Sequence, residues 1–219
     1  MLVKDFITKE IPVLKKYDTG EYALALMDDF KVKHLPLVNE GVCQCLVAEK
    51  DILTMSDLSA VIDSSGLFSP TITDDANLHE ALAMITRYGL SLLPVVDSQG
   101  AYLGSITRER LVDVLSDLCC ADAAGSVIVL EVMPQDYSLA DIARLVEANH
   151  AHVLNVLYSQ EKETGRLLIT IKIDLEDASP VIRSFERFNY TVRYHFMEKG
   201  LVDDMLSQRM NELLYYMKM

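Results

Sequence analysis

Hydrophobic and polar positions follow the same layout twice in the first half of the chain. Apolar side chains recur at helical spacing in residues 23–30 and again in residues 81–88. Each helical pattern is followed by a short apolar run with a proline in its middle, and these prolines, Pro36 and Pro94, lie 58 residues apart. Because proline donates no backbone hydrogen bond, each run is expected to start a strand or to lie at a sheet edge.

A polar turn, a second apolar run and a helix follow in both copies. Residues 39–41 and 97–100 have the turn chemistry that joins two antiparallel strands. The next helix is expected to begin after Ala48 in the first copy and after Thr107 in the second. Thr107 is a typical N-cap residue, because its hydroxyl can accept a backbone N–H, whereas Ala48 cannot cap. Since a repeat of this length is one supersecondary unit used twice, we expect two similar units.

The second half of the chain has another order of elements, after a run of small residues at 121–125. Its patterns predict strand, helix, strand, strand, helix and strand in residues 126–133, 139–146, 152–158, 166–173, 175–188 and 190–196. This β-α-β-β-α-β order is typical of a ferredoxin-like layout. In residues 198–219 apolar side chains recur at spacings of three and four, which predicts an amphipathic C-terminal helix.

Composition and charge narrow the class of protein. The chain has 219 residues, of which 50% are hydrophobic, which is ample for packed cores. Its net charge of −13 argues against nucleic-acid binding and against docking on an anionic membrane, since both need clustered Lys and Arg. No apolar run approaches the ~18 residues of a membrane span, and no signal-peptide pattern opens the chain. We therefore expect a cytoplasmic protein.

Cysteine and histidine indicate little chemistry. The four Cys include no pair with the spacing of a zinc knuckle or a redox motif, so we expect buried or half-buried free thiols. His150 and His152 alternate on a run that looks like a strand and would share a face, where a metal could bind. This pair is the only basis for an enzyme hypothesis, which ranks last. We expect no catalytic site and no metal site.

The repeated pattern resembles a tandem pair of CBS domains. The resemblance rests on a strand with Pro and two apolar residues, a turn, a second strand and a helix, an order that occurs twice. In the second copy the second strand contains Gly104 and the helix follows Thr107. It implies one repeat in residues 1–63 and a second in residues 64–122, packed sheet to sheet about a pseudo-twofold axis. It also implies clefts that bind adenosine-containing ligands and thereby regulate an attached or partner activity.

The ligand motif of this family, Ser/Thr-x-x-Asp, is divided between the two copies. The resemblance implies a hydroxyl near phosphate and a carboxylate that accepts both hydrogen bonds of a ribose diol. The first copy has Ala48 and Asp51, and the second has Thr107 and Arg110. Cations near the second helix start, and those just before the first proline run (Lys31, Lys33 and His34), are candidates to meet phosphate. The candidate ligand-binding residues are Asp51, Thr107, Arg108, Arg110 and His34.

Two features of the first half work against a nucleotide. The glycine of the family's second strand is present as Gly104, whereas the first copy has Cys45, whose side chain is expected to crowd a ligand. Residues 1–122 also carry 10 Lys and Arg against 19 Asp and Glu, so an anionic ligand depends on local cations.

Residues 126–197 resemble an ACT domain. Such domains bind amino acids at interfaces between paired copies, through a loop after the first strand that carries Asp-x-x-Gly. Asp136 matches the acid, but no glycine follows it, so use of the domain for dimerisation is the favoured interpretation. The predicted fold class is α+β, with tandem CBS repeats, a ferredoxin-like ACT-like domain and a C-terminal helix. This combination is similar to bacterial acetoin-utilisation regulatory proteins.

Two functional hypotheses follow. In the first, the chain is a non-catalytic regulatory protein that senses AMP, ADP, ATP or S-adenosylmethionine in the CBS cleft and requires no cofactor. In the second, it is a homodimeric scaffold with degenerate, ligand-free pockets. Both hypotheses expect a homodimer, and the first also a regulated partner protein. Neither involves nucleic acid or a membrane.

Overall fold

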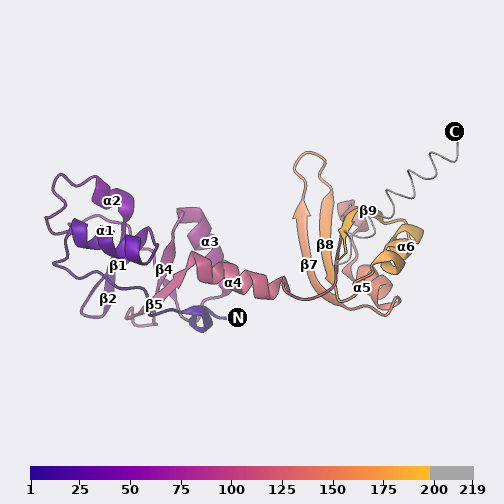
Figure 1. The fold of residues 1–219 in the computed structure, drawn as a ribbon, viewed down its shortest axis with the longest axis horizontal. Helices are drawn as coiled ribbons and strands as arrows, with labels where there is room; N and C mark the ends of the chain where they lie inside the picture. The colour runs from indigo at the N-terminus through magenta and orange to yellow at the C-terminus, as the bar shows by residue number, and fades with distance from the viewer. Residues whose placement is uncertain (198–219) are drawn as a thin grey trace. The chain divides into compact units, whose positions relative to one another are not determined.

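A computed structural model describes residues 1–197 and divides into two compact units, Met1–Val114 and a second unit that begins at Leu115 (Figure 1). Each unit has its own hydrophobic core. Among the helices of residues 1–197, none combines the length and the apolarity that a bilayer crossing requires.

The first repeat contains a hairpin of two strands with a helix on either side in sequence. After a short 3-10 helix, η1 (Val3–Phe6), come α1 (Gly20–Asp29), β1 (His34–Asn39), β2 (Val42–Ala48) and α2 (Glu49–Leu53). The strands pair antiparallel, with His34 opposite Ala48. Helix α1 begins where the hydroxyl of Thr19 accepts the backbone N–H of Tyr22. The helix-strand-turn-strand-helix order predicted for this copy is confirmed.

The second repeat has the same order with longer helices. Its elements are β3 (Ile72–Thr73), α3 (Leu78–Tyr88), β4 (Leu92–Val96), β5 (Tyr102–Thr107) and α4 (Arg108–Leu118), and its sheet has the order β3-β4-β5. Leu92 lies opposite Thr107, as His34 lies opposite Ala48 in the first repeat. The predicted N-cap is confirmed, because the hydroxyl of Thr107 accepts the backbone N–H of Arg110 at 3.1 Å.

A segment of each repeat pairs with a strand of the other repeat. Near the N-terminus, Thr8 exchanges two backbone hydrogen bonds with Ser105 of β5. In the first repeat, the backbone N–H of Leu46 donates to the carbonyl of Phe68 at 2.9 Å. The two hairpin turns also meet, since Tyr102 donates a backbone hydrogen bond of 2.7 Å to Gly41. The repeats are therefore interleaved around one core, to which both contribute fully buried residues such as Leu35, Ile52, Leu92, Ile106 and Leu111.

The second unit is a four-stranded antiparallel sheet with two helices. Its elements are β6 (Ser126–Val132), η2 (Pro134–Asp136), α5 (Leu139–Glu147), β7 (Val153–Gln160), β8 (Leu167–Ile173), α6 (Ser179–Arg187) and β9 (Thr191–Phe196). The strand order is β7-β8-β6-β9, which places the first and last strands side by side. Both helices lie against one face of this sheet (Figure 1), where Ile128, Ile169 and Phe185 are buried.

The predicted β-α-β-β-α-β order is confirmed, with one error in extent. The helix expected over 175–188 is shorter, because α6 begins only at Ser179. There Asp177 accepts the backbone N–H of Ser179 at 2.9 Å, and Pro180 occupies the first turn, where a missing N–H costs nothing. The helix predicted for residues 198–219 lies outside the described residues.

Candidate functional site

The two repeats are joined by hydrogen bonds where β1 and β4 begin. The backbone N–H of Lys33 donates to Ser91 Oγ at 3.0 Å. His34 Nδ1 lies 3.0 Å from the same hydroxyl and 3.1 Å from the backbone nitrogen of Ser91. Since a backbone N–H can only donate, His34 Nδ1 is an acceptor and the proton of the neutral imidazole is on Nε2.

The starts of α2 and α4 are held beside this junction in the same way. The carbonyl of Lys33 accepts the backbone N–H of Glu49, the first residue of α2, at 2.9 Å. The carbonyl of Ser91 accepts the backbone N–H of Arg108, the first residue of α4, at 2.9 Å. The two helix starts are thus placed by equivalent hydrogen bonds in the two repeats.

Charged groups from both helix starts act on His34. Burial lowers the pKa of His34 below its ordinary value, and the positive charges of Lys50 and Arg108 act in the same direction. Asp51 and Glu49 oppose this effect. Two predicted site residues, Asp51 and Arg108, therefore both lie within electrostatic reach of a third, His34, and His34 favours its neutral form.

The divided family motif corresponds to a divided capping box. A complete box has a hydroxyl that accepts the N–H of the third helical residue and an acid there that accepts the N–H of the cap residue. In the first repeat Asp51 Oδ2 accepts the N–H of Ala48 at 3.3 Å. In the second repeat Thr107 accepts the N–H of Arg110. Each repeat has retained one half, and each half satisfies one backbone group at its helix start.

The candidate side chains differ in how free they are to bind a ligand. Thr107 is buried and its oxygen is already an acceptor, whereas Asp51 is half-buried and its Oδ1 has no hydrogen bond among the described residues. Arg108 and Arg110 are exposed, and neither forms an ion pair within residues 1–197. The carboxylate and the two guanidinium groups are thus open to solvent.

The two lysines before β1 line a cavity of about 340 Å³. Both already have acidic neighbours, since Lys31 Nζ lies 3.0 Å from Asp28 and Lys33 Nζ lies 4.0 Å from Glu49. Three of these side chains are largely exposed and Glu49 is partly exposed, and ion pairs of this kind contribute at most about 1 kcal/mol. The lysines can therefore exchange these partners for an anion at little cost.

Gly104 lies where the N-terminal segment of the chain packs against β5. Its φ is +154°, and a Cβ added there would lie 2.4 Å from Ile7 Cγ2 and 2.7 Å from the carbonyl oxygen of Thr8. The chain's own N-terminal segment therefore requires a residue without a side chain at this position.

The first-repeat equivalent, Cys45, is only 1% exposed. Burial raises the pKa of its thiol to about 11, with a further contribution from Asp51. Burial likewise raises the pKa of the half-buried Cys43 thiol to about 11. The expectation of buried or half-buried free thiols is confirmed for the four Cys, and the raised pKa values keep the thiols of Cys43 and Cys45 protonated at neutral pH.

The strand predicted to hold His150 and His152 does not include them. His150 has a φ of +58° in the turn before β7, which begins at Val153. His152 instead lies beside a carboxylate, with Nδ1 at 2.7 Å from Asp174 Oδ2. The expectation of a shared strand face is wrong, because the chain turns at His150. In residues 1–197 no three His, Cys, Asp or Glu side chains form a group that could hold a metal.

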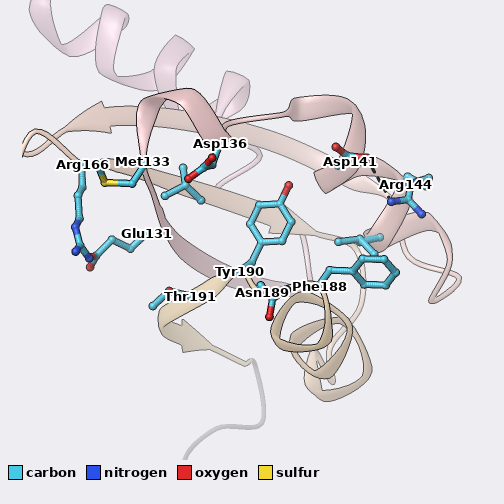
Figure 2. A pocket seen from close by; sticks show the side chains of 12 residues that line it. Glu131, Met133, Asp136, Asp141, Arg144, Arg166, Phe188, Asn189, Tyr190 and Thr191 are labelled. Carbon is cyan, nitrogen blue, oxygen red and sulfur yellow. Dashed lines mark hydrogen bonds and ion pairs between the residues drawn. The ribbon is translucent and has the colours of Figure 1, made fainter.

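A second cavity, of about 580 Å³, lies in the second unit (Figure 2). It lies between the loop after β6, the start of α5 and the turn before β9. Of its residues the sequence singled out only Asp136, as the acid of an ACT-like loop. The others come from segments about 50 residues apart in sequence that meet because β9 pairs with β6, and no local pattern reveals that pairing.

Comparisons with known proteins bear on the first unit. The CBS domain family model matches residues 3–57 and 68–117. A homoserine O-acetyltransferase of Methanocorpusculum labreanum is 28% identical over 117 residues, which are 51% of this chain and 23% of the relative. The chain thus spans about a quarter of the length of the curated relatives it matches.

Two solved structures resemble this chain over about half its length. A CBS domain pair/ACT domain protein from Thermotoga maritima has a TM-score of 0.49 and 21% identity, covering 53% of this chain and 98% of that one. CBSX2 in complex with AMP has a TM-score of 0.45 and 24% identity, covering 53% of this chain and 97% of that one. On the family match, the N-terminal half of this chain is a tandem pair of CBS domains.

Proposed function

We propose that this chain is a non-catalytic regulatory protein whose CBS pair binds an adenine nucleotide between its repeats. The observation that supports this most directly is that Asp51 and Arg108, at the starts of the two helices, both act electrostatically on His34, which joins the repeats. A carboxylate, a guanidinium and a neutral imidazole are therefore available near this junction.

The proposed contacts follow from the side chains that are free. Asp51 Oδ1 is available to accept from a ribose hydroxyl, since only Oδ2 is used at the helix start. The guanidinium of Arg108 matches the geometry of a phosphate, which it can bind with two parallel hydrogen bonds. Thr107 contributes by fixing the start of α4, and with it the position of Arg108.

The acidic charge of the first half favours ligands with few phosphates. Residues 1–122 carry 10 Lys and Arg against 19 Asp and Glu, so each additional phosphate meets repulsion. We therefore expect AMP to bind more tightly than ATP. S-adenosylmethionine, which has a positive sulfonium in place of phosphate, is the second ligand that this charge favours.

The second unit is proposed to be an ACT-like domain that responds to this binding. Its β-α-β-β-α-β order and strand order support that assignment. Helix α4 begins at the candidate site with Arg108 and continues to Leu118, past the division between the units. A ligand that binds two arrangements of α4 with different affinities would shift their populations. We also propose that the chain forms a homodimer, which the mass in solution tests.

Thermal melting of the full chain with AMP, ADP, ATP, NAD and S-adenosylmethionine tests the proposal. A ligand at ten times its Kd stabilises the folded state by about 1.4 kcal/mol, which raises the melting temperature by a few degrees. Asp51→Asn and Arg108→Ala should remove the shift. Asp75→Asn and Arg87→Ala, exposed residues of the same unit, should keep it. No shift with any ligand at millimolar concentration would support the ligand-free scaffold instead.

A further inference from the structure

The cavity of the second unit is lined by side chains of both charges around a tyrosine (Figure 2). The end of β6 and the start of β9 lie side by side, with Glu131 opposite Thr191. This pairing brings the loop after β6 next to Tyr190. The lining residues are Glu131, Val132, Met133, Asp136, Asp141, Arg144, Leu145, Arg166, Phe188, Asn189, Tyr190 and Thr191.

Both arginines of the lining are already paired with acids. Arg166 forms an ion pair with Glu131, which is mostly buried and also lies 3.7 Å from Arg193. At the other end, Arg144 lies 3.3 Å from Asp141. The guanidinium of Arg144 also lies over the ring of Phe188, 5.5 Å from its centroid. An anionic ligand group in this cavity would therefore have to compete with an acidic side chain for either arginine.

One carboxylate of the lining has no such partner. Asp136 makes neither an ion pair nor a hydrogen bond through its carboxylate within residues 1–197. The hydroxyl of Tyr190 is likewise without a hydrogen bond among the described residues. Figure 2 shows this hydroxyl directed toward the side of the cavity where Asp136 and Asp141 lie. Burial raises the pKa of Tyr190, Asp141 and Asp136 act in the same direction, and Arg144 opposes them, as expected for a hydroxyl on that side of the cavity.

We propose that this cavity binds a small organic amine in its protonated form. The ammonium group would donate to the carboxylate of Asp136 and to the oxygen of Tyr190, and both hydrogen bonds are charge-assisted because the donor is a cation. The aliphatic part would lie against Val132, Leu145 and Met133. A protonated amine supplies one positive charge, which matches the one unpaired negative charge of the lining.

The same charges disfavour an amino acid. Its carboxylate would need a guanidinium, and Arg144 and Arg166 are held by Asp141 and Glu131. Taking either arginine would exchange one ion pair for another, so the carboxylate gains no net attraction. It would also lie near the unpaired negative charge of Asp136, which a simple ammonium ion compensates. The proposal is independent of nucleotide binding in the CBS pair, since the cavity contains residues of the second unit alone.

Calorimetric titration of the full chain with three matched compounds tests this proposal. n-Butylamine has the ammonium group, n-butanol replaces it with a hydroxyl, and norvaline is the same amine with a carboxylate on the carbon that bears nitrogen. We expect saturable binding of n-butylamine, with n-butanol and norvaline each weaker by about tenfold or more. Absence of n-butylamine binding, or tighter binding of norvaline, would overturn the proposal.

Two variants connect the binding to this cavity. Asp136→Asn should weaken n-butylamine about tenfold or more, because it removes the charge and keeps the shape. Glu163→Gln, the same change in the exposed turn between β7 and β8, should leave the affinity unaltered. Asp141→Asn releases Arg144, so it should strengthen norvaline relative to n-butylamine. Equal affinities in Asp136→Asn and in the unchanged chain would contradict the assignment.

Discussion

The two CBS repeats have the same order of elements and different side chains at their helix starts. In the first, an acid at the third helical residue holds the N–H of Ala48. In the second, the hydroxyl of Thr107 holds the N–H of Arg110. Either half of a capping box suffices to begin the helix. Each half-motif is therefore explained by folding alone, and the side chains that remain as candidates for ligand contacts are those left free, Asp51 Oδ1, Arg108 and Arg110.

The second strands of the two repeats, β2 and β5, have different residues at equivalent positions, and packing explains the difference. Gly104 admits the N-terminal segment at a distance that leaves no space for a Cβ, whereas Cys45 is packed in the shared core. Edge-strand pairing by Thr8 in one repeat and Phe68 in the other is similar in both. The glycine is thus required by the packing of the N-terminal segment against β5. The variants below test this difference and the others, from the largest expected effect to the smallest.

The largest effect is expected from Gly104→Ala. Its methyl group would meet Ile7 and Thr8 below contact distance, at a φ that disfavours any side chain. We expect a loss of about 2–4 kcal/mol in the free energy of unfolding, measured by urea denaturation. The equivalent Cys45→Ala should cost about 1 kcal/mol, for a small lost volume. Similar losses at both positions would remove the proposed difference.

The next effect concerns the contact that joins the repeats. Ser91→Ala removes a hydroxyl that accepts the N–H of Lys33 and contacts His34. We expect a loss of about 1–2 kcal/mol, because the N–H of Lys33 is left without its partner. Ser116→Ala, a serine of the C-terminal part of α4, is the control and should change stability by less than about 0.5 kcal/mol. A negligible loss in Ser91→Ala would show that the hydroxyl is not needed at the junction.

A smaller pair of effects tests the divided capping box directly. Thr107→Ala should lower the free energy of unfolding by about 1 kcal/mol, since the N–H of Arg110 loses its acceptor. Ala48→Ser completes the box in the first repeat and should raise it by about 0.5 kcal/mol. Denaturant titrations of both variants measure the two changes. A loss in both would mean that the first repeat cannot accommodate the hydroxyl.

The smallest effect is a pH dependence of the junction. The folded chain holds the pKa of His34 below its ordinary value of 6.5, so the unfolded chain binds the proton more readily. The contribution of His34 is thus fully present above that value and is lost as the pH falls below it. His34→Gln should reduce the loss of stability between about pH 7.5 and pH 5.5. An unchanged loss would assign the dependence to other groups.

The sequence predicted elements well and packing between them poorly. The hairpin strands of the first unit, the strands of the second unit and the N-cap at Thr107 follow from local patterns, and the structure confirms them. The approach of Thr8 to Gly104 and the cavity beside Tyr190 depend on strands that pair across long stretches of chain. The error at His150 has a local cause, a residue at positive φ where the alternation of side chains predicted a strand.

The residues of the candidate site could be predicted from the sequence, whereas their spatial arrangement could be predicted only in part. The family motif indicates Asp51 and Thr107, and the cations near the helix start and before the proline run add Arg108 and His34. The structure brings Asp51 and Arg108 within electrostatic reach of His34. The sequence did not indicate Ser91, whose contact with His34 joins residues 57 positions apart. A serine before a strand has no distinctive local signal, and its role arises only when the repeats pack.

Calorimetric titration with AMP tests the central proposal most directly, applied to the unchanged chain, Arg108→Ala and the control Arg87→Ala. The account predicts saturable binding in the unchanged chain and in the control, weakened about tenfold or more in Arg108→Ala. It also predicts weaker binding of ATP than of AMP to the unchanged chain. Absence of heat with either nucleotide at millimolar concentration, or equal affinities in Arg108→Ala and the control, would contradict a nucleotide site at the junction of the repeats.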